Sequence, residues 1–156
     1  ALAREAGACE KGIELALKYS SFEEAFNSDH PKAAKYAYFY ANFIAEKPFD
    51  VTPKAILKSA SYAYRYARDA LKKPYDVTPK AILKSAHCAY FYAKDVLKRP
   101  YDVTPKAILE DAEYAYYYFK DVLMKPYDET PKSILGSEHY AYLYSKDVLG
   151  CLGDNN

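Results

Sequence analysis

The sequence is poor in glycine and cysteine and has almost no net charge. Its 5 glycines in 156 residues offer no glycine-rich loop for holding phosphates. Lysine and arginine number 22 against 21 acidic residues, so the positive field that supports non-specific nucleic-acid binding is missing, and a nucleic-acid partner is disfavoured. The 3 cysteines form no CxxC pair, which favours free thiols in a reducing compartment; they are Cys9, Cys88 and Cys151.

The sequence also has no long apolar run. Its first segment, ALAREAGACEKGIELAL, alternates charged and apolar residues and resembles neither a signal peptide nor a membrane span. We therefore expect a cytoplasmic protein without a membrane partner.

What the sequence does contain is four tandem copies of a 26-residue unit, the first of which reads PFDVTPKAILKSASYAYRYARDALKK. A unit this short cannot bury its own apolar face, so neighbouring copies must stack and share a core. We predict an all-α fold, a right-handed α-solenoid of 26-residue helix-pair repeats forming a single domain over residues 1–156. The repeats span residues 48–73, 74–99, 100–125 and 126–151, and residues 22–47 form a fifth, divergent copy.

Each unit contains signals for two helices. Thr52 is expected to cap, and Pro53 to begin, a short helix over residues 53–59. A longer helix over about residues 61–72 must stop before Pro74, because proline disfavours a helical residue ahead of it.

The two ends of the sequence differ from the repeats. Residues 1–21 contain an amphipathic helix, from about Leu2 to Tyr19, which we expect to cap the stack. Ser21 and Glu24 have capping-box spacing for the helix that follows. Gly150 and Gly153 should stop the last helix, and residues 152–156 should fray.

The longer helix of each unit carries a broad arc of tyrosine and alanine. Tyrosine accounts for 19 residues, and at helical spacing it favours a core over a platform for stacking bases. Buried tyrosine hydroxyls need partners, and the recurrent positions of Arg68 and Asp69 are the candidates.

The segments YAYFYAKDVLK and YAYLYSKDVL resemble short helix-pair repeats in uncharacterised bacteriophage and other viral proteins. The resemblance covers most of the chain and implies a helical solenoid. It implies no activity, because those families have no agreed function. A phage source would place the protein in the cytoplasm of a host cell and suggest interference with a host protein.

Positions that vary between the copies point to a binding surface. On the longer helices these positions lie outside the tyrosine arc, in pairs four residues apart, and several are apolar. We call this surface the ridge and expect it to contact a protein partner or a second copy of the chain; the alternative is burial against the neighbouring unit. The ridge consists of Phe39, Arg65, Phe91, Tyr117 and Leu143, with Lys35, Ser61, His87, Glu113 and His139 beside them.

A lysine recurs at the start of each short helix. This lysine ladder could bind the phosphates of a nucleotide or a nucleic acid, and it consists of Lys54, Lys80, Lys106 and Lys132. Aspartates four residues earlier could instead neutralise the lysines or cap the helix, and this second reading is favoured; they are Asp50, Asp76, Asp102 and Asp128.

No catalytic set or cofactor site is predicted, and we expect a non-enzyme. His87 and His139 hold equivalent positions two units apart, too far to share a metal ion. Cys88 is adjacent to His87, but neighbouring side chains diverge on a helix. The recurrent carboxylates form a ladder, whereas a catalytic pair would be singular.

Overall fold

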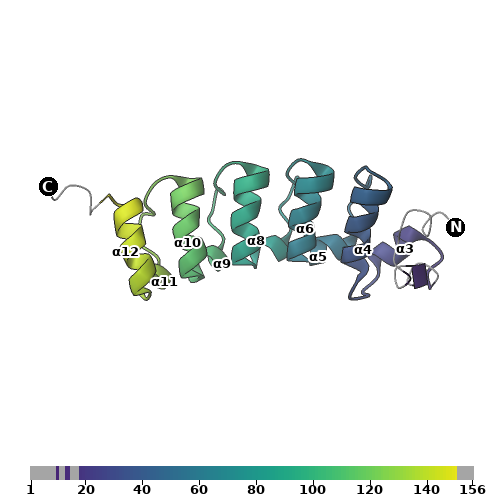
Figure 1. Cartoon of the computed structure of the whole chain (residues 1–156), viewed down its shortest axis with the longest axis horizontal. Coiled ribbons are helices and arrows are strands. Elements are labelled where there is room, and N and C mark those ends of the chain that lie inside the picture. Colours follow the sequence, from purple (N-terminus) through teal and green to yellow (C-terminus); the bar gives the residue numbers. More distant parts are fainter. Residues whose placement is uncertain (1–9, 11–12, 15–17, 151–156) are drawn as a thin grey trace. The chain divides into compact units, whose positions relative to one another are not determined.

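The computed structural model describes residues 10, 13–14 and 18–150, and these contain ten α-helices, four π-helical segments and no strand (Figure 1). The all-α prediction is therefore confirmed over this part of the chain. The structure divides into two compact units, Ala1–Ala81 and Ile82–Asn156, which we describe separately as the amino-terminal and carboxyl-terminal units. The single-domain assignment stays a prediction.

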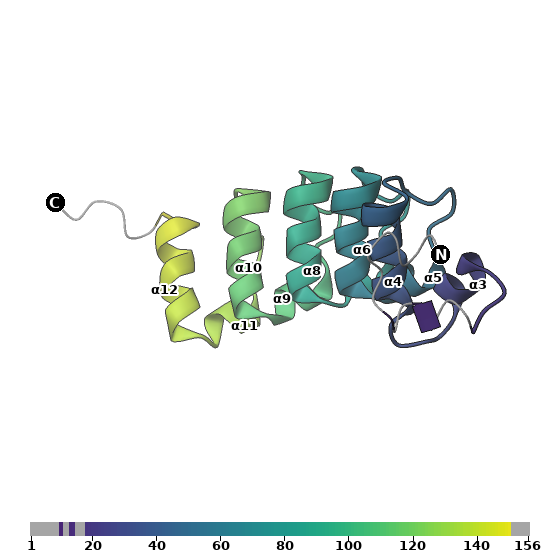
Figure 2. The ribbon, with the colours of Figure 1, turned by 45° about the vertical axis from the view of Figure 1, so that its right-hand side comes forward.

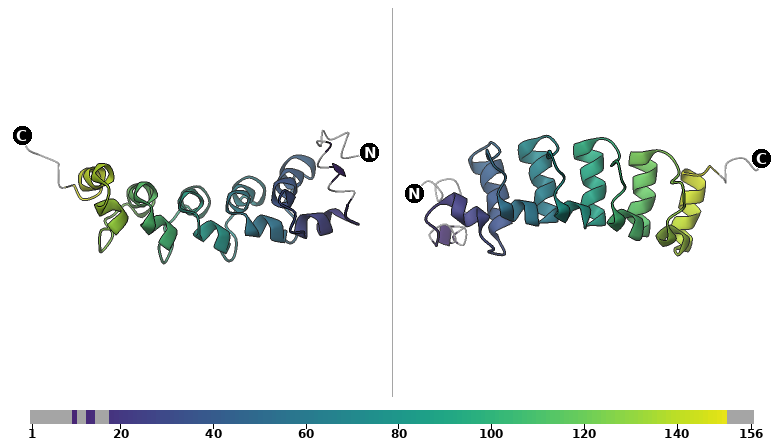
Figure 3. Two further views of the ribbon diagram at one scale, coloured as in Figure 1. Left: turned by 90° about the horizontal axis from the view of Figure 1, so that it is seen from below. Right: turned by 180° about the vertical axis from the view of Figure 1, so that it is seen from behind.

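The amino-terminal unit contains two helix pairs. The short helices α3 and α5 pack against the long helix α4, and α4 also packs against α6, which continues the second pair. Seen from below in Figure 3, the two long helices of this unit lie side by side, with its short helices on one side of them. The elements are α3 (Phe22–Asn27), α4 (Ala33–Phe39), η1 (Tyr40–Ile44), α5 (Lys54–Lys58), α6 (Ala60–Tyr66) and η2 (Ala67–Leu71).

The carboxyl-terminal unit repeats this arrangement. The long helices α8, α10 and α12 lie side by side in Figure 2, and α10 contacts both of the others. Short helix α9 packs against α8 and α10, and α11 packs against α10 and α12. After α7 (Lys80–Leu83), at the boundary of the units, come α8 (Ala86–Phe91), η3 (Tyr92–Leu97), α9 (Lys106–Glu110), α10 (Ala112–Tyr118), η4 (Phe119–Leu123), α11 (Lys132–Leu135) and α12 (Glu138–Asp147).

The expected threonine caps are wrong. Helix α5 begins at Lys54 after an extended Pro53, and its first N–H donates at 2.9 Å to the side-chain oxygen of Asn27 on α3, not to Thr52. The hydroxyl of Thr52 instead hydrogen-bonds the phenol of the buried Tyr66, and Thr104 does the same for Tyr118. The true caps lie at the starts of the long helices, where Ser59, Ser85, Asp111 and Ser137 each accept a hydrogen bond from the backbone N–H three residues later.

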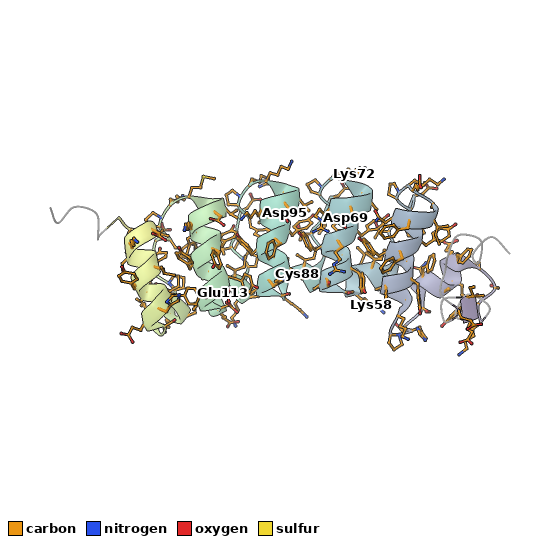
Figure 4. All side chains as sticks on the ribbon, in the orientation of Figure 1. Lys58, Asp69, Lys72, Cys88, Asp95 and Glu113 are labelled. Atoms are coloured by element: carbon orange, nitrogen blue, oxygen red, sulfur yellow. The ribbon has the colours of Figure 1, made fainter. Side chains whose placement is uncertain are left out.

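The backbone conformation at the ends of the long helices was not predicted from the sequence. In all but α12 the last turn widens into a π-helical segment. The chain then leaves the helix through a residue in the left-handed region, and within the described residues such positions recur every 26 residues. They are Glu46, Lys72, Lys98, Met124 and Gly150. Figure 4 shows Lys72 at this end of its long helix. At each of these left-handed residues the chain turns from the long helix into the loop that follows.

From α6 onward, one tyrosine per long helix lies at the centre of the core. Tyr66, Tyr92, Tyr118 and Tyr144 are almost completely buried. The hydroxyls of three of them accept hydrogen bonds from loop backbone 17 residues earlier: Phe49 N–H to Tyr66 at 2.7 Å, Tyr101 N–H to Tyr118 at 2.9 Å and Tyr127 N–H to Tyr144 at 3.1 Å. The phenol of Tyr101 in turn donates to the Ala89 carbonyl at 2.9 Å. Each loop is thus held to the core by a polar contact that burial strengthens.

A second tyrosine joins neighbouring helix pairs. The hydroxyl of Tyr38 donates to Asp69 at 2.7 Å, and that of Tyr90 donates to Asp121 at 2.6 Å; in both cases the partners are 31 residues apart. Tyr116 and Asp147 form the same bond. The prediction that these aspartates satisfy tyrosine hydroxyls is confirmed.

The predicted ends of the chain are described only in part. Ser21 accepts a hydrogen bond from the Glu24 N–H at 3.1 Å, as the capping box requires, while the Glu24 carboxylate accepts from the backbone of Ser20. Most of the predicted capping helix within residues 1–21 and the tail 151–156 lie outside the described residues. Gly150 is left-handed, as expected of a residue that stops a helix.

Candidate protein-interaction surface

In the amino-terminal unit the ridge residues are exposed. Phe39, at the end of α4, has 39% of its surface exposed, and the Lys35 ammonium lies 5.9 Å from the centre of its ring. On α6, Ser61 and Arg65 are exposed, and the Arg65 guanidinium lies 5.9 Å from the Tyr62 ring. This part of the ridge combines an aromatic ring with two cations.

The sequence analysis missed two residues that enlarge this surface. Phe43 has 60% of its surface exposed and stacks on Phe39 with ring centroids 5.4 Å apart, and Ile44 follows it with 39% exposed. The signal was present, because Phe43 occupies the repeat position where the other copies have Asp69, Asp95, Asp121 and Asp147. An apolar residue at a position that is acidic in the other copies indicates that this position has a different role in the first copy.

In the carboxyl-terminal unit the ridge is partly covered by its own neighbours. Phe91 lies 4.8 Å from the rings of both His87 and Tyr90, and Tyr117 lies 6.1 Å from Tyr90. Phe91, Tyr117 and Leu143 are half-buried, whereas the residues beside them remain exposed: His87, Glu113 and His139. The ridge side chains therefore rest on the tyrosine layer without entering the core.

The tyrosines beneath the ridge have their polar groups occupied. Burial, followed by the hydrogen bond to Asp69, raises the pKa of Tyr38 to about 12. Burial also raises the pKa of Tyr90, with Asp121 adding to the effect. For Asp121 itself burial opposes ionisation, but hydrogen bonds from Tyr90 and Lys94 bring its pKa below the usual value. These groups hold neighbouring helices together.

The lysine ladder is exposed, and one of its lysines pairs with a residue other than the expected aspartate. Lys106 pairs with Glu110 at 3.2 Å, not with Asp102, which accepts from Arg99 at 3.1 Å. The reason is geometric: Glu110 lies one turn along the same helix. The ladder residues Lys54, Lys80, Lys106 and Lys132 all lie on the solvent side.

The expectation that His87 and Cys88 diverge is wrong. The imidazole of His87 packs against the rings of Phe91 and Tyr114. In this position its Nδ1 lies 3.8 Å from the Cys88 sulfur. Cys88 is a free thiol and is 6% exposed. Cys9 and Cys151 lie outside the described residues. Over the part that the structure describes, no group of three or more potential ligands could hold a metal ion.

No known family model matches the chain, and neither a curated protein nor a solved structure is significantly similar to it. The described helices are all too short or too polar to cross a membrane.

Proposed function

We propose that the helix pairs build a right-handed α-solenoid with a 26-residue period, and that the protein is a non-enzymatic protein-binding module acting through the ridge. The observation that carries this proposal is the stacked pair Phe39 and Phe43, which are 39% and 60% exposed, whereas other aromatic rings of the protein are buried in its core. Exposed aromatic clusters rimmed by polar residues are typical of protein interfaces.

The partner class follows from the repeats themselves. Their resemblance to repeats of bacteriophage proteins makes a host protein the partner that we propose, met in the host cytoplasm. The odd number of cysteines, with Cys88 free, fits such a reducing compartment.

The test is affinity capture from a host-cell lysate, with retained proteins identified by mass spectrometry. We expect a protein that binds the wild type and is lost with the double variant Phe91→Arg, Tyr117→Arg and with Phe39→Arg. The matched control is Val77→Arg, Val103→Arg, which adds the same charge at loop valines that are each 83% exposed and away from the ridge. Circular dichroism verifies that every variant is folded.

Equal capture by the wild type and both ridge variants would refute the ridge as the binding surface. The ridge contact should also tolerate salt, because burial of aromatic surface drives it.

Phosphate binding by the lysine ladder is the second candidate, supported by the exposure of all four lysines. It predicts binding of a labelled oligonucleotide that weakens steeply with salt and is lost with Lys80→Gln, Lys106→Gln. The pairing of Lys106 with Glu110 counts against it.

A further inference from the structure

Three loops of the protein carry a strongly exposed valine at the same repeat position. Val51, Val77 and Val103 stand directly before the Thr-Pro step that leads into each short helix, and they are 84%, 83% and 83% exposed. The exposure is the same in three successive copies of the repeat, so it does not depend on a copy's place in the sequence. These valines are a regular apolar feature of the loop surface.

The fold does not require a valine at this position. Glu129 takes its place in a further copy and is exposed as well. The loop keeps its shape there, because Pro131 has φ −57° and ψ 140° and Pro53 has φ −57° and ψ 141°. Exposed positions on the long helices differ from copy to copy, whereas this apolar residue recurs. A contact outside the chain accounts for its recurrence.

In the amino-terminal unit each loop valine lies between two opposite charges. It directly follows an aspartate and stands three residues before a lysine. These four charged side chains are exposed, and none forms an ion pair with a residue that the structure describes; they are Asp50, Asp76, Lys54 and Lys80. We call them, together with Val51 and Val77, the valine edge.

The carboxyl-terminal unit has already used the corresponding charges. Asp102 accepts from Arg99 at 3.1 Å, and Lys106 pairs with Glu110 at 3.2 Å. The charges that remain available beside a loop valine are therefore those of the amino-terminal unit. Its two loops leave from neighbouring helix ends, because η1 and η2 contact each other, and both begin with a left-handed residue.

We propose that the valine edge binds the valine edge of a second copy of this chain in a two-fold symmetric dimer. A two-fold axis reverses the direction of the facing chain, so the aspartate end of each loop meets the lysine end of the loop opposite. The valines are then removed from water between two sets of complementary charges. Two acidic and two basic groups cancel, so the edge offers no attraction to a polyanion such as a nucleic acid.

The dimer is of the weak, reversible class. Two valines in each chain give an apolar centre much smaller than that of a stable interface, and exposed ion pairs add little each. Association is therefore expected only at high protein concentration. The proposal concerns the loops and not the ridge, and it does not depend on the function proposed above.

Sedimentation velocity of the full chain over a wide concentration series tests the proposal. We expect the wild type to shift toward the dimer as concentration rises, and Val77→Glu to weaken association about tenfold or more, because it places a charge in the apolar centre. The fold accepts a glutamate here, as Glu129 shows.

Two variants serve as controls for this measurement. Val103→Glu makes the same change in the carboxyl-terminal unit, and Phe39→Arg changes the ridge; both should associate as the wild type does. A wild type that remains monomeric at every concentration overturns the proposal, as does equal association by Val77→Glu and the wild type.

A pair of charge-reversal variants tests the pairing across the axis. One chain carries Asp50→Lys, Asp76→Lys, and the other carries Lys54→Asp, Lys80→Asp. Each variant alone has an edge of one sign and should not associate, whereas an equimolar mixture should form a mixed dimer because facing charges are again opposite. Circular dichroism verifies that both variants are folded. A mixture that stays monomeric refutes the two-fold pairing.

General attraction between oppositely charged chains needs its own control. A mixture of Asp128→Lys with Lys132→Asp places the same reversals in the carboxyl-terminal unit, and it should associate no more strongly than the wild type. A gain in association equal to that of the edge variants would contradict a contact made by the valine edge.

Discussion

Tyrosine has three different roles within one turn and a half of helix α10. Tyr118 is buried and accepts a hydrogen bond from loop backbone, Tyr116 donates to Asp147 of the next helix pair, and the Tyr114 ring packs at a tilt against Tyr90 of the preceding one. A phenol suits all three roles because it joins a large apolar ring to a group that both donates and accepts. Residue type alone therefore does not reveal which tyrosines carry polar contacts.

The substitution Tyr118→Phe isolates the polar contact of the buried ring. Removal of the hydroxyl leaves the Tyr101 N–H and the Thr104 hydroxyl without their partner, so we expect the free energy of unfolding to fall by about 1–3 kcal/mol. The matched control is Tyr142→Phe, at an exposed site, which should change the free energy by less than about 0.5 kcal/mol. Urea unfolding followed by circular dichroism measures both, and equal effects would contradict the role given to Tyr118.

Several of these residue roles were predictable from the sequence. The helical spacing of tyrosine and alanine identified the buried arc, and the recurrence of Asp69 identified the acceptor for tyrosine hydroxyls. The role of Thr52 was not predictable, because Thr-Pro is an ordinary helix start and its true partner, Tyr66, lies in a different element. Phe43 could have been found by comparing the aspartate positions of all five copies.

At the scale of elements, the long helices are joined through single tyrosine and aspartate pairs. Tyr38 on α4 donates to Asp69 in the π-helical segment after α6. The π-helical segments and left-handed exits were not predictable, since Lys72, Lys98 and Met124 are not residues that favour a positive φ. They follow from the packing of whole helix pairs, which short-range signals do not encode.

This link predicts how stability changes at alkaline pH. Burial and the nearby Asp69 raise the pKa of Tyr38 to about 12, against roughly 10 in an unfolded chain. The neutral phenol is therefore favoured by folding, so its contribution is fully present below about pH 10 and is lost as the pH rises toward 12. We expect the free energy of unfolding to decline over this range.

The variant Tyr38→Phe serves as the control for the alkaline decline. It lacks the titrating group, so its stability should fall less steeply between about pH 10 and 12 than that of the wild type. Urea unfolding at a series of pH values provides the comparison. Identical slopes for the two proteins would show that the Tyr38 hydroxyl is not held as described.

At the scale of the whole molecule, the same joint occurs in both units. Residues at equivalent positions have the same partners, such as the 31-residue pairs Tyr90 with Asp121 and Tyr116 with Asp147. In such an array stability is a sum over units and their nearest neighbours. Removing one complete unit should therefore leave a folded protein.

Deletion of residues 100–125 tests this expectation. It joins Arg99 to Pro126, a junction like the natural one with Pro100, and it places Asp147 opposite Tyr90. Circular dichroism should show unchanged helix content per residue, with a lower Tm because one interface is lost. A deletion of residues 100–112 removes half a unit, breaks the register and should unfold the carboxyl-terminal unit. Loss of helix in the full-unit deletion would contradict additive repeats.

The short spans of these tyrosine contacts also bear on how quickly the chain finds its structure. A loop closed over 17 or 31 residues costs little chain entropy, so a helix pair and its neighbour can assemble before distant segments meet. Folding dominated by such local closures belongs to the fast class, on the order of microseconds to milliseconds. Any of the helix pairs can serve as the starting point, and growth proceeds outward from it one unit at a time.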